Sequence, residues 1–113
     1  MIGNSSLNKK WVTFALTQII DNAIKYSKDN GKIIIRISQA SIEISDDGSG
    51  ILEEDLPRIF EEGFTGFNGH EHQKATGLGL YMTKQVLDSL SLDINIQSQI
   101  DQGTHVLITP KKR

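Results

Sequence analysis

Apolar residues recur at spacings of three and four between Lys10 and Ser27, which predicts a long amphipathic helix. The stretch KDNG ends this pattern, and its glycine, Gly31, suits a left-handed turn. The β-branched runs KIIIRIS and SIEIS follow around the short connection QA and predict a hairpin. Helical spacing returns in LGLYMTKQVLDSL, and the alternating stretches LDINIQS and THVLITP predict two further strands.

The middle of the chain is less regular. LEEDLPRIF opens with acids and places Leu56 and Ile59 three residues apart, which predicts a short helix provided that Pro57 lies in its first turn. Residues 62–76 contain glycine, polar residues and histidine without any periodicity. A loop of this length inside a compact domain is typically a functional lid or disordered, and we interpret it as a lid.

The order of these elements predicts the α+β class, as a two-layer sandwich of helices on a mostly antiparallel sheet. A chain of 113 residues with 37% hydrophobic content fits one domain with a single core, which we assign to residues 9–113. Residues 1–8 are polar and contribute nothing to a core. We expect them to form a disordered lead-in or an expression remnant.

Composition narrows the possible functions. The formal net charge of −2, with acids and bases evenly mixed, gives no reason to expect a nucleic-acid or membrane partner. A chain without cysteine forms no disulfide and no thiolate metal site. No apolar segment approaches the roughly 20 residues that span a bilayer. The absence of cysteine agrees with a reducing compartment, and we expect this chain to reside in the cytoplasm.

The first predicted helix carries polar residues on one face. Gln18, Asn22 and Lys25 lie at spacings of four and three, so their side chains project from the same side. A solvated face is the ordinary explanation of such a stripe. Asparagine is a middling-to-poor helix former, however, and Asn22 stands among apolar residues. A carboxamide oxygen that coordinates Mg²⁺ would give a reason for its presence.

The stretch DDGSGI places Asp46 at the end of a predicted strand, with Gly48 and Gly50 directly after it. Glycines without side chains would let a flat ring or a phosphate approach the backbone. An ionised aspartate only accepts hydrogen bonds, which matches the exocyclic amine of adenine. A tight surface turn is the alternative, because aspartate and glycine are common turn residues.

The stretch TGLGLYM places Gly77 and Gly79 at the start of a predicted helix, where unpaired N–H groups and the helix dipole favour an anion such as phosphate. It is neither a phosphate loop of the G-x-x-x-x-G-K-[ST] type nor a dinucleotide fingerprint. Upstream, Phe60, Phe64 and Phe67 favour anchoring of the lid over a stacking platform.

The order and spacing of these stretches resemble the catalytic, ATP-binding domain of bacterial sensor histidine kinases. Their superfamily also holds gyrase, the ninety-kilodalton heat-shock chaperones and the mismatch-repair ATPases. QIIDNAIKYS resembles the N box, DDGSG the D-x-G-x-G box, RIFEEGFTG the F box and TGLGL the second glycine box. The resemblance covers residues 9–110. GFTGFNG followed by TGLGLYM is further similar to the small kinases of Gram-positive bacteria that work beside peptide-antibiotic transporters.

The resemblance implies a site for Mg-ATP. Asp46 would accept the adenine amine, Asn22 would hold Mg²⁺, and Lys25 would reach the phosphates. The other residues that we assign to the nucleotide with this resemblance are Tyr26, Gly48, Gly50, Ile51, Phe60, Thr76, Gly77, Leu78, Gly79, Leu80 and Thr104. The charge and position of Lys74 and His72 in the loop indicate a contact with the terminal phosphate, with a solvated loop as the alternative for both.

Gln18 indicates which kind of group accepts the phosphate. The hydrolases of the superfamily carry a glutamate at this position, which activates water, whereas glutamine cannot take a proton. An imidazole already offers a lone pair and needs less help from a base, so Gln18 favours histidine as the phosphate acceptor. None of the three histidines, His70, His72 and His105, lies in the sequence context of the acceptor histidine that the resemblance implies.

The resemblance thus implies a protein-histidine kinase of two-component signalling. The chain would donate the terminal phosphate of ATP to a histidine on a separate dimerisation hairpin, with a response regulator downstream. The parent protein would be a membrane-anchored homodimer in a Gram-positive bacterium, with this chain as a cytoplasmic domain. The alternative is a nucleotide-binding regulatory module that signals through lid order without turnover.

Overall fold

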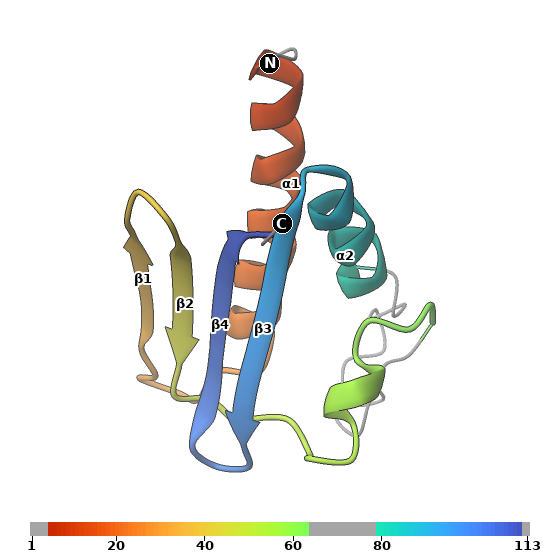
Figure 1. Ribbon diagram of the computed structural model, residues 1–113. Coiled ribbons are helices and arrows are strands. Elements are labelled where there is room, and N and C mark those ends of the chain that lie inside the picture. Colours follow the sequence, from red (N-terminus) through yellow and green to blue (C-terminus); the bar gives the residue numbers. More distant parts are fainter. Residues whose placement is uncertain (1–4, 64–78, 112–113) are drawn as a thin grey trace.

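The computed structural model describes residues 5–63 and 79–111, with side chains from residue 8 on. Helices α1 (Ser5–Lys25) and α2 (Gly79–Ser89) lie on one side of a four-stranded sheet (Figure 1). A 3-10 turn, η1 (Leu56–Arg58), lies between the strands of the first hairpin and α2 in the chain. The predicted α+β class and two-layer arrangement are confirmed.

The sheet consists of β1 (Ile33–Ile37), β2 (Ile42–Asp46), β3 (Leu92–Gln99) and β4 (Gly103–Pro110), in the order β1-β2-β4-β3. Every neighbouring pair among these strands is antiparallel. The register sets Asp46 opposite Thr104 and Thr104 opposite Ser98. These three residues therefore form one row across β2, β4 and β3, at the same end of the sheet.

The core lies between the helices and the inner face of the sheet. In β3 half-buried residues alternate with exposed ones, as expected for a strand with one face covered. On α1, Ala15, Ile19 and Ala23 are buried at spacings of four, which turns this stripe toward the sheet. The central cluster of buried residues consists of Ala15, Ile19, Ile44, Leu87, Val106 and Ile108.

Two elements differ from the sequence-based expectation. Helix α1 begins at Ser5 rather than at Lys10, so residues 5–8 of the expected lead-in are helical. The short helix predicted over LEEDLPRIF is only a 3-10 turn with Pro57 near its start. Since proline has no N–H for the carbonyl four residues back, an α-helix does not propagate there.

The lid predicted over residues 62–76 lies, from residue 64 on, outside the described residues. Of the helices in the two described segments, none combines the length and the apolar character that crossing a bilayer requires.

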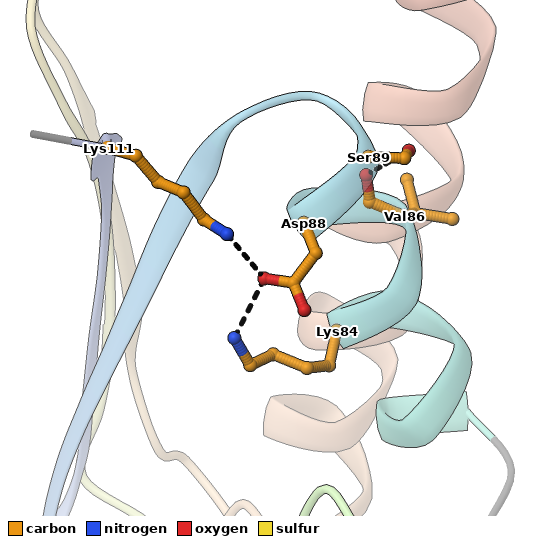
Figure 2. Close-up of polar contacts among 5 residues, drawn as sticks. All are labelled: Lys84, Val86, Asp88, Ser89 and Lys111. Atoms are coloured by element: carbon orange, nitrogen blue, oxygen red, sulfur yellow. Dashed lines mark hydrogen bonds and ion pairs between the residues drawn. The ribbon is translucent and has the colours of Figure 1, made fainter. Parts of the chain in front are cut away.

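A small ionic cluster joins the C-terminal end of α2 to the residue that follows β4 (Figure 2). The Asp88 carboxylate accepts hydrogen bonds from Lys84 Nζ at 2.9 Å and from Lys111 Nζ at 3.0 Å. The Lys84 contact, and next the Lys111 contact, lower the pKa of Asp88. The Lys111 N–H donates to the Ser91 carbonyl at 2.9 Å. These exposed ion pairs contribute at most about 1 kcal/mol each, but they join the residue after β4 to α2.

Candidate functional site

The candidate site lies where α1 and β2 end and β4 begins. Asp46 is the last residue of β2, and Thr104, opposite it, is the second residue of β4. Both side chains are half-buried. Because directly opposed residues share a face of the sheet, Asp46, Thr104 and Ser98 project toward the side that carries the helices. The strand register thus brings together a carboxylate and two hydroxyl groups.

The loop after Asp46 is held against the end of α1. The Ser49 N–H donates to the Tyr26 carbonyl at 3.0 Å. A Cβ at Gly48 would lie 2.4 Å from that same Tyr26 oxygen. Only glycine fits here without a shift of backbone, so Gly48 has a packing role of its own.

The other side of this loop rests on the turn between β3 and β4. Gly50 has a φ of +75°, and a Cβ there would lie 2.1 Å from the Gln99 carbonyl oxygen. The Asp101 N–H donates to the Ser49 carbonyl at 2.9 Å. The stretch DDGSG is therefore clamped between α1 and the β3–β4 turn, which an independent surface turn would not require. Its glycines admit neighbouring backbone, a reason that differs from the close approach of a ring expected from the sequence.

Asp46 is the half-buried acid of the site. Burial raises the pKa of the Asp46 carboxyl above its ordinary value, and the neighbouring Asp47 carboxylate adds to this. The backbone N–H groups of Gly48 and Thr104 oppose the rise, and the Gly48 N–H lies 2.9 Å from Oδ1. A carboxylate offers about four lone-pair positions, so Asp46 retains capacity for another donor. Asp47 instead accepts the Lys32 N–H at 2.9 Å and braces the preceding turn.

The polar face predicted on α1 reaches from the core to solvent. Gln18 and Asn22 are half-buried, whereas Lys25 is exposed in the last turn. The Gln18 Oε1 atom lies 2.7 Å from the place of a Cβ on Gly79. Gln18 therefore contacts the first residue of α2, where the phosphates of a nucleotide were expected.

The remaining predicted residues fall into two groups. Tyr26, Ile51, Phe60 and Leu80 are half-buried in the described part of the chain. The Ile51 N–H donates to Ser98 Oγ at 2.8 Å. The following predicted positions lie outside the described residues: His70, His72, Lys74, Thr76, Gly77 and Leu78. His105 is away from the site, because it bonds Ser45 across the opposite face of the sheet at 2.6 Å.

Sequence reasoning missed two residues of the site. Ser98 bonds both Ile51 and Thr104, and Gly103, with a φ of +111°, lies against Asp46. A signal for Ser98 existed in the alternation of β3, since this serine falls in phase with the inward-facing Ile94 and Ile96. A polar residue at an inward position near a strand end indicates a hydrogen-bonding role.

Comparisons with known proteins agree with this geometry. The sequence model of the family described as "Histidine kinase-, DNA gyrase B-, and HSP90-like ATPase" matches residues 8–113. The chain is 40% identical over 107 residues to "Sensor protein BceS" of Halalkalibacterium halodurans, a match covering 91% of this chain and 32% of that protein. It is 38% identical over 108 residues to "Sensor histidine kinase GraS" of Staphylococcus haemolyticus, covering 92% and 31%.

A solved structure of a sensor histidine kinase also resembles this chain. The "Mycobacterial sensor histidine kinase MprB" superimposes with a TM-score of 0.75 at 26% identity, over 99% of this chain and 78% of that chain. The chain spans about a third of the length of the curated relatives it matches. The resemblance seen in the sequence is confirmed, and the chain belongs to the family of histidine kinase-, DNA gyrase B- and HSP90-like ATPases.

Proposed function

We propose that this chain is the ATP-binding catalytic domain of a sensor histidine kinase. It binds Mg-ATP and donates the terminal phosphate to a histidine on a separate dimerisation hairpin. The observation that carries this proposal is the half-buried Asp46 carboxylate, clamped beside Thr104 at the ends of α1 and β2 in a chain of this ATPase family. A half-buried acid with remaining acceptor capacity suits the amine of adenine.

The adenine end of the nucleotide lies at the row of Asp46 and Thr104. Asp46 accepts the exocyclic amine, and Ile51 and Tyr26 contact the base. The clamped backbone at Gly48 and Gly50 keeps the Asp46 carboxylate in one orientation, which limits the freedom lost on binding.

The phosphate end lies between the polar face of α1 and the start of α2. The N-terminal N–H groups of α2, from Gly79 and Leu80 on, favour an anion, and Gln18 contacts this helix start. Asn22 would hold Mg²⁺ through its side-chain oxygen, and the ion would neutralise phosphate charge. Lys25 approaches the phosphates from the last turn of α1, and we extend the same role to Lys74, Thr76, Gly77 and Leu78.

The chemistry is transfer of a phosphoryl group. A nitrogen lone pair of the acceptor imidazole forms a bond to the γ-phosphorus, the bond to the bridging oxygen breaks, and ADP leaves with the electron pair. The chain supplies mainly positioning and charge stabilisation. Gln18, which cannot take a proton, gives no base for activating water, and this favours transfer over hydrolysis.

The relatives named as sensor kinases support a proposal for the wider setting. The hairpin with the acceptor histidine belongs to the same kinase, and a response regulator receives the phosphoryl group from it. The parent is a membrane-anchored homodimer of a Gram-positive bacterium, in which this domain lies in the cytoplasm. The function is tested by supplying the chain with ATP labelled in its terminal phosphate together with such a hairpin, and by measuring label on the histidine.

The role of Asn22 leads to a specific prediction. Asn22→Ala should weaken ATP binding in the presence of magnesium by about tenfold and change metal-free binding by less than about twofold, because one ligand of a hard cation is lost. Calorimetric titrations with and without magnesium measure both quantities. The exposed Thr17→Ala is a control on the same helix. Equal losses in the two conditions would assign Asn22 to packing.

A further inference from the structure

The hydroxyl of Ser98 connects three separate parts of the proposed adenine site. Its Oγ atom lies 2.8 Å from the Ile51 nitrogen, 2.9 Å from the Gly103 carbonyl oxygen and 2.8 Å from Thr104 Oγ1. Ser98 itself belongs to β3, Ile51 to the loop after β2, and Gly103 and Thr104 are the first two residues of β4. Ser98 is thus surrounded by a donor, an acceptor and a second hydroxyl.

Only one arrangement of protons makes all three contacts hydrogen bonds at the same time. The Ile51 N–H can only donate, and the Gly103 carbonyl can only accept. A serine hydroxyl has one proton and two lone pairs. The Ser98 proton therefore goes to Gly103, one lone pair takes the Ile51 N–H, and the other takes the Thr104 hydroxyl proton. Every hydrogen-bonding position of Ser98 is then filled.

This direction determines what Thr104 offers to a ligand. With its only proton directed at Ser98, the Thr104 oxygen presents lone pairs alone. Asp46, the residue paired with Thr104 across β2 and β4, also presents lone pairs. The two side chains form a pair of acceptors, and an exocyclic amine has two N–H groups to give them.

We propose that Ser98 is a positioning residue that holds Thr104 as a hydrogen-bond acceptor, and that it thereby makes the site selective for a 6-amino purine over a 6-oxo purine. This inference rests on the proposed function. A 6-oxo group is an acceptor, and it would face the oxygens of both Asp46 and Thr104.

A purely structural role of Ser98 predicts something different. Ser98 also holds the loop at Ile51, beside the hydrogen bond from the Asp101 N–H to the Ser49 carbonyl. If loop bracing were its only contribution, its loss would weaken all nucleotides alike. The ratio of affinities for two purines that differ only at position 6 separates the two roles.

The experiment compares ATP with inosine triphosphate in the presence of magnesium, by calorimetric titration of the whole chain. For Ser98→Ala we expect ATP affinity to fall about fivefold and inosine triphosphate affinity to hold or rise, since the freed Thr104 proton can then be donated to the 6-oxo group. The preference for ATP should therefore drop about five- to tenfold, as one neutral hydrogen bond changes direction.

Ser45→Ala is the matched control. Ser45 is also a half-buried strand serine with a cross-strand hydrogen bond, at 2.6 Å to His105, but it lies on the opposite face of the sheet. It should leave both affinities unchanged. Thr104→Val removes the same acceptor at similar volume and should also reduce the preference for ATP, so it carries the test if Ser98→Ala does not fold.

The outcomes are distinguishable. An unchanged ATP preference in the folded variants would overturn the role of Ser98, whether or not both affinities fell together. A wild-type chain that bound inosine triphosphate as tightly as ATP would overturn the proposed adenine site itself.

Discussion

Replacing Asp46 by asparagine should lower the affinity for Mg-ATP by about 10- to 100-fold, the range expected for a hydrogen bond to a charged group. The Gly48 N–H, 2.9 Å from Oδ1, requires an oxygen at that position. The new amide would keep its oxygen there and turn its NH₂ group toward the adenine amine, so two donors would meet. Rotation of the amide would only move the conflict to Gly48.

Calorimetry with ATP and GTP measures this effect, and thermal unfolding checks that the variant keeps its fold. Asp47→Asn is the matched control, because Asp47 accepts the Lys32 N–H outside the site. The wild type should reject GTP. If GTP bound as tightly as ATP, or if Asp47→Asn lost as much affinity as Asp46→Asn, the adenine role of Asp46 would be wrong.

Because the pKa of Asp46 is raised, both the stability of the chain and its affinity for ATP should depend on pH. Burial favours the protonated carboxyl in the folded chain, so ionisation of Asp46 reduces stability as the pH rises through its folded pKa. Nucleotide binding has the opposite sign, because the amine requires the ionised acceptor. ATP affinity should therefore fall as the pH drops through this raised pKa, at a higher pH than for an exposed aspartate, and Asp46→Asn should remove this step.

Replacing Gly103 by alanine should reduce the free energy of unfolding by more than about 3 kcal/mol, as backbone strain and a steric clash add. Gly103 has a φ of +111°, and a Cβ there would lie 2.0 Å from the Asp46 carbonyl oxygen. The new methyl group forces β4 away from the end of β2, where Asp46 and Thr104 are paired. ATP binding should be lost together with stability.

Gly63→Ala separates the cost of backbone strain from the cost of the steric clash. Gly63 also has a positive φ, +82°, but a Cβ there would meet nothing within 4 Å among residues 5–63 and 79–111. It should cost only about 1–2 kcal/mol, the strain of the left-handed backbone alone. Urea unfolding measures both variants, and equal losses would show that the approach of Gly103 to Asp46 has no energetic effect.

The sequence predicted those parts of the fold that depend on local periodicity. The apolar spacing around Ala15 and Ile19 and the alternation in the two hairpins identified α1 and all four strands. The start of α1 was missed because residues 5–8 offer no apolar stripe. Pro57 was recognised as a constraint, but whether its turn would continue as a helix depends on backbone hydrogen bonds that the pattern does not contain.

The candidate site was predictable only where one residue carries the chemistry. Asp46 stands out beside two glycines, and the structure places it half-buried at the end of β2. Ser98 acquires its role only when β3 pairs with β4 and brings it against Ile51, 47 positions away in the chain. The same holds for Gly50 and Gly103, whose close neighbours belong to other strands and turns.

The most direct test of the proposed function is phosphoryl transfer to a histidine. The chain is incubated with magnesium and ATP labelled in the terminal phosphate, with and without a hairpin that carries the acceptor histidine. Alone, it should bind the nucleotide yet release little phosphate and acquire no label, because Gln18 cannot activate water. With the hairpin, label should appear on the hairpin in an acid-labile, alkali-stable form, as a phosphoramidate is. Rapid release of phosphate by the chain alone would indicate a hydrolase, and no transfer to a properly paired hairpin would leave only a nucleotide-binding module.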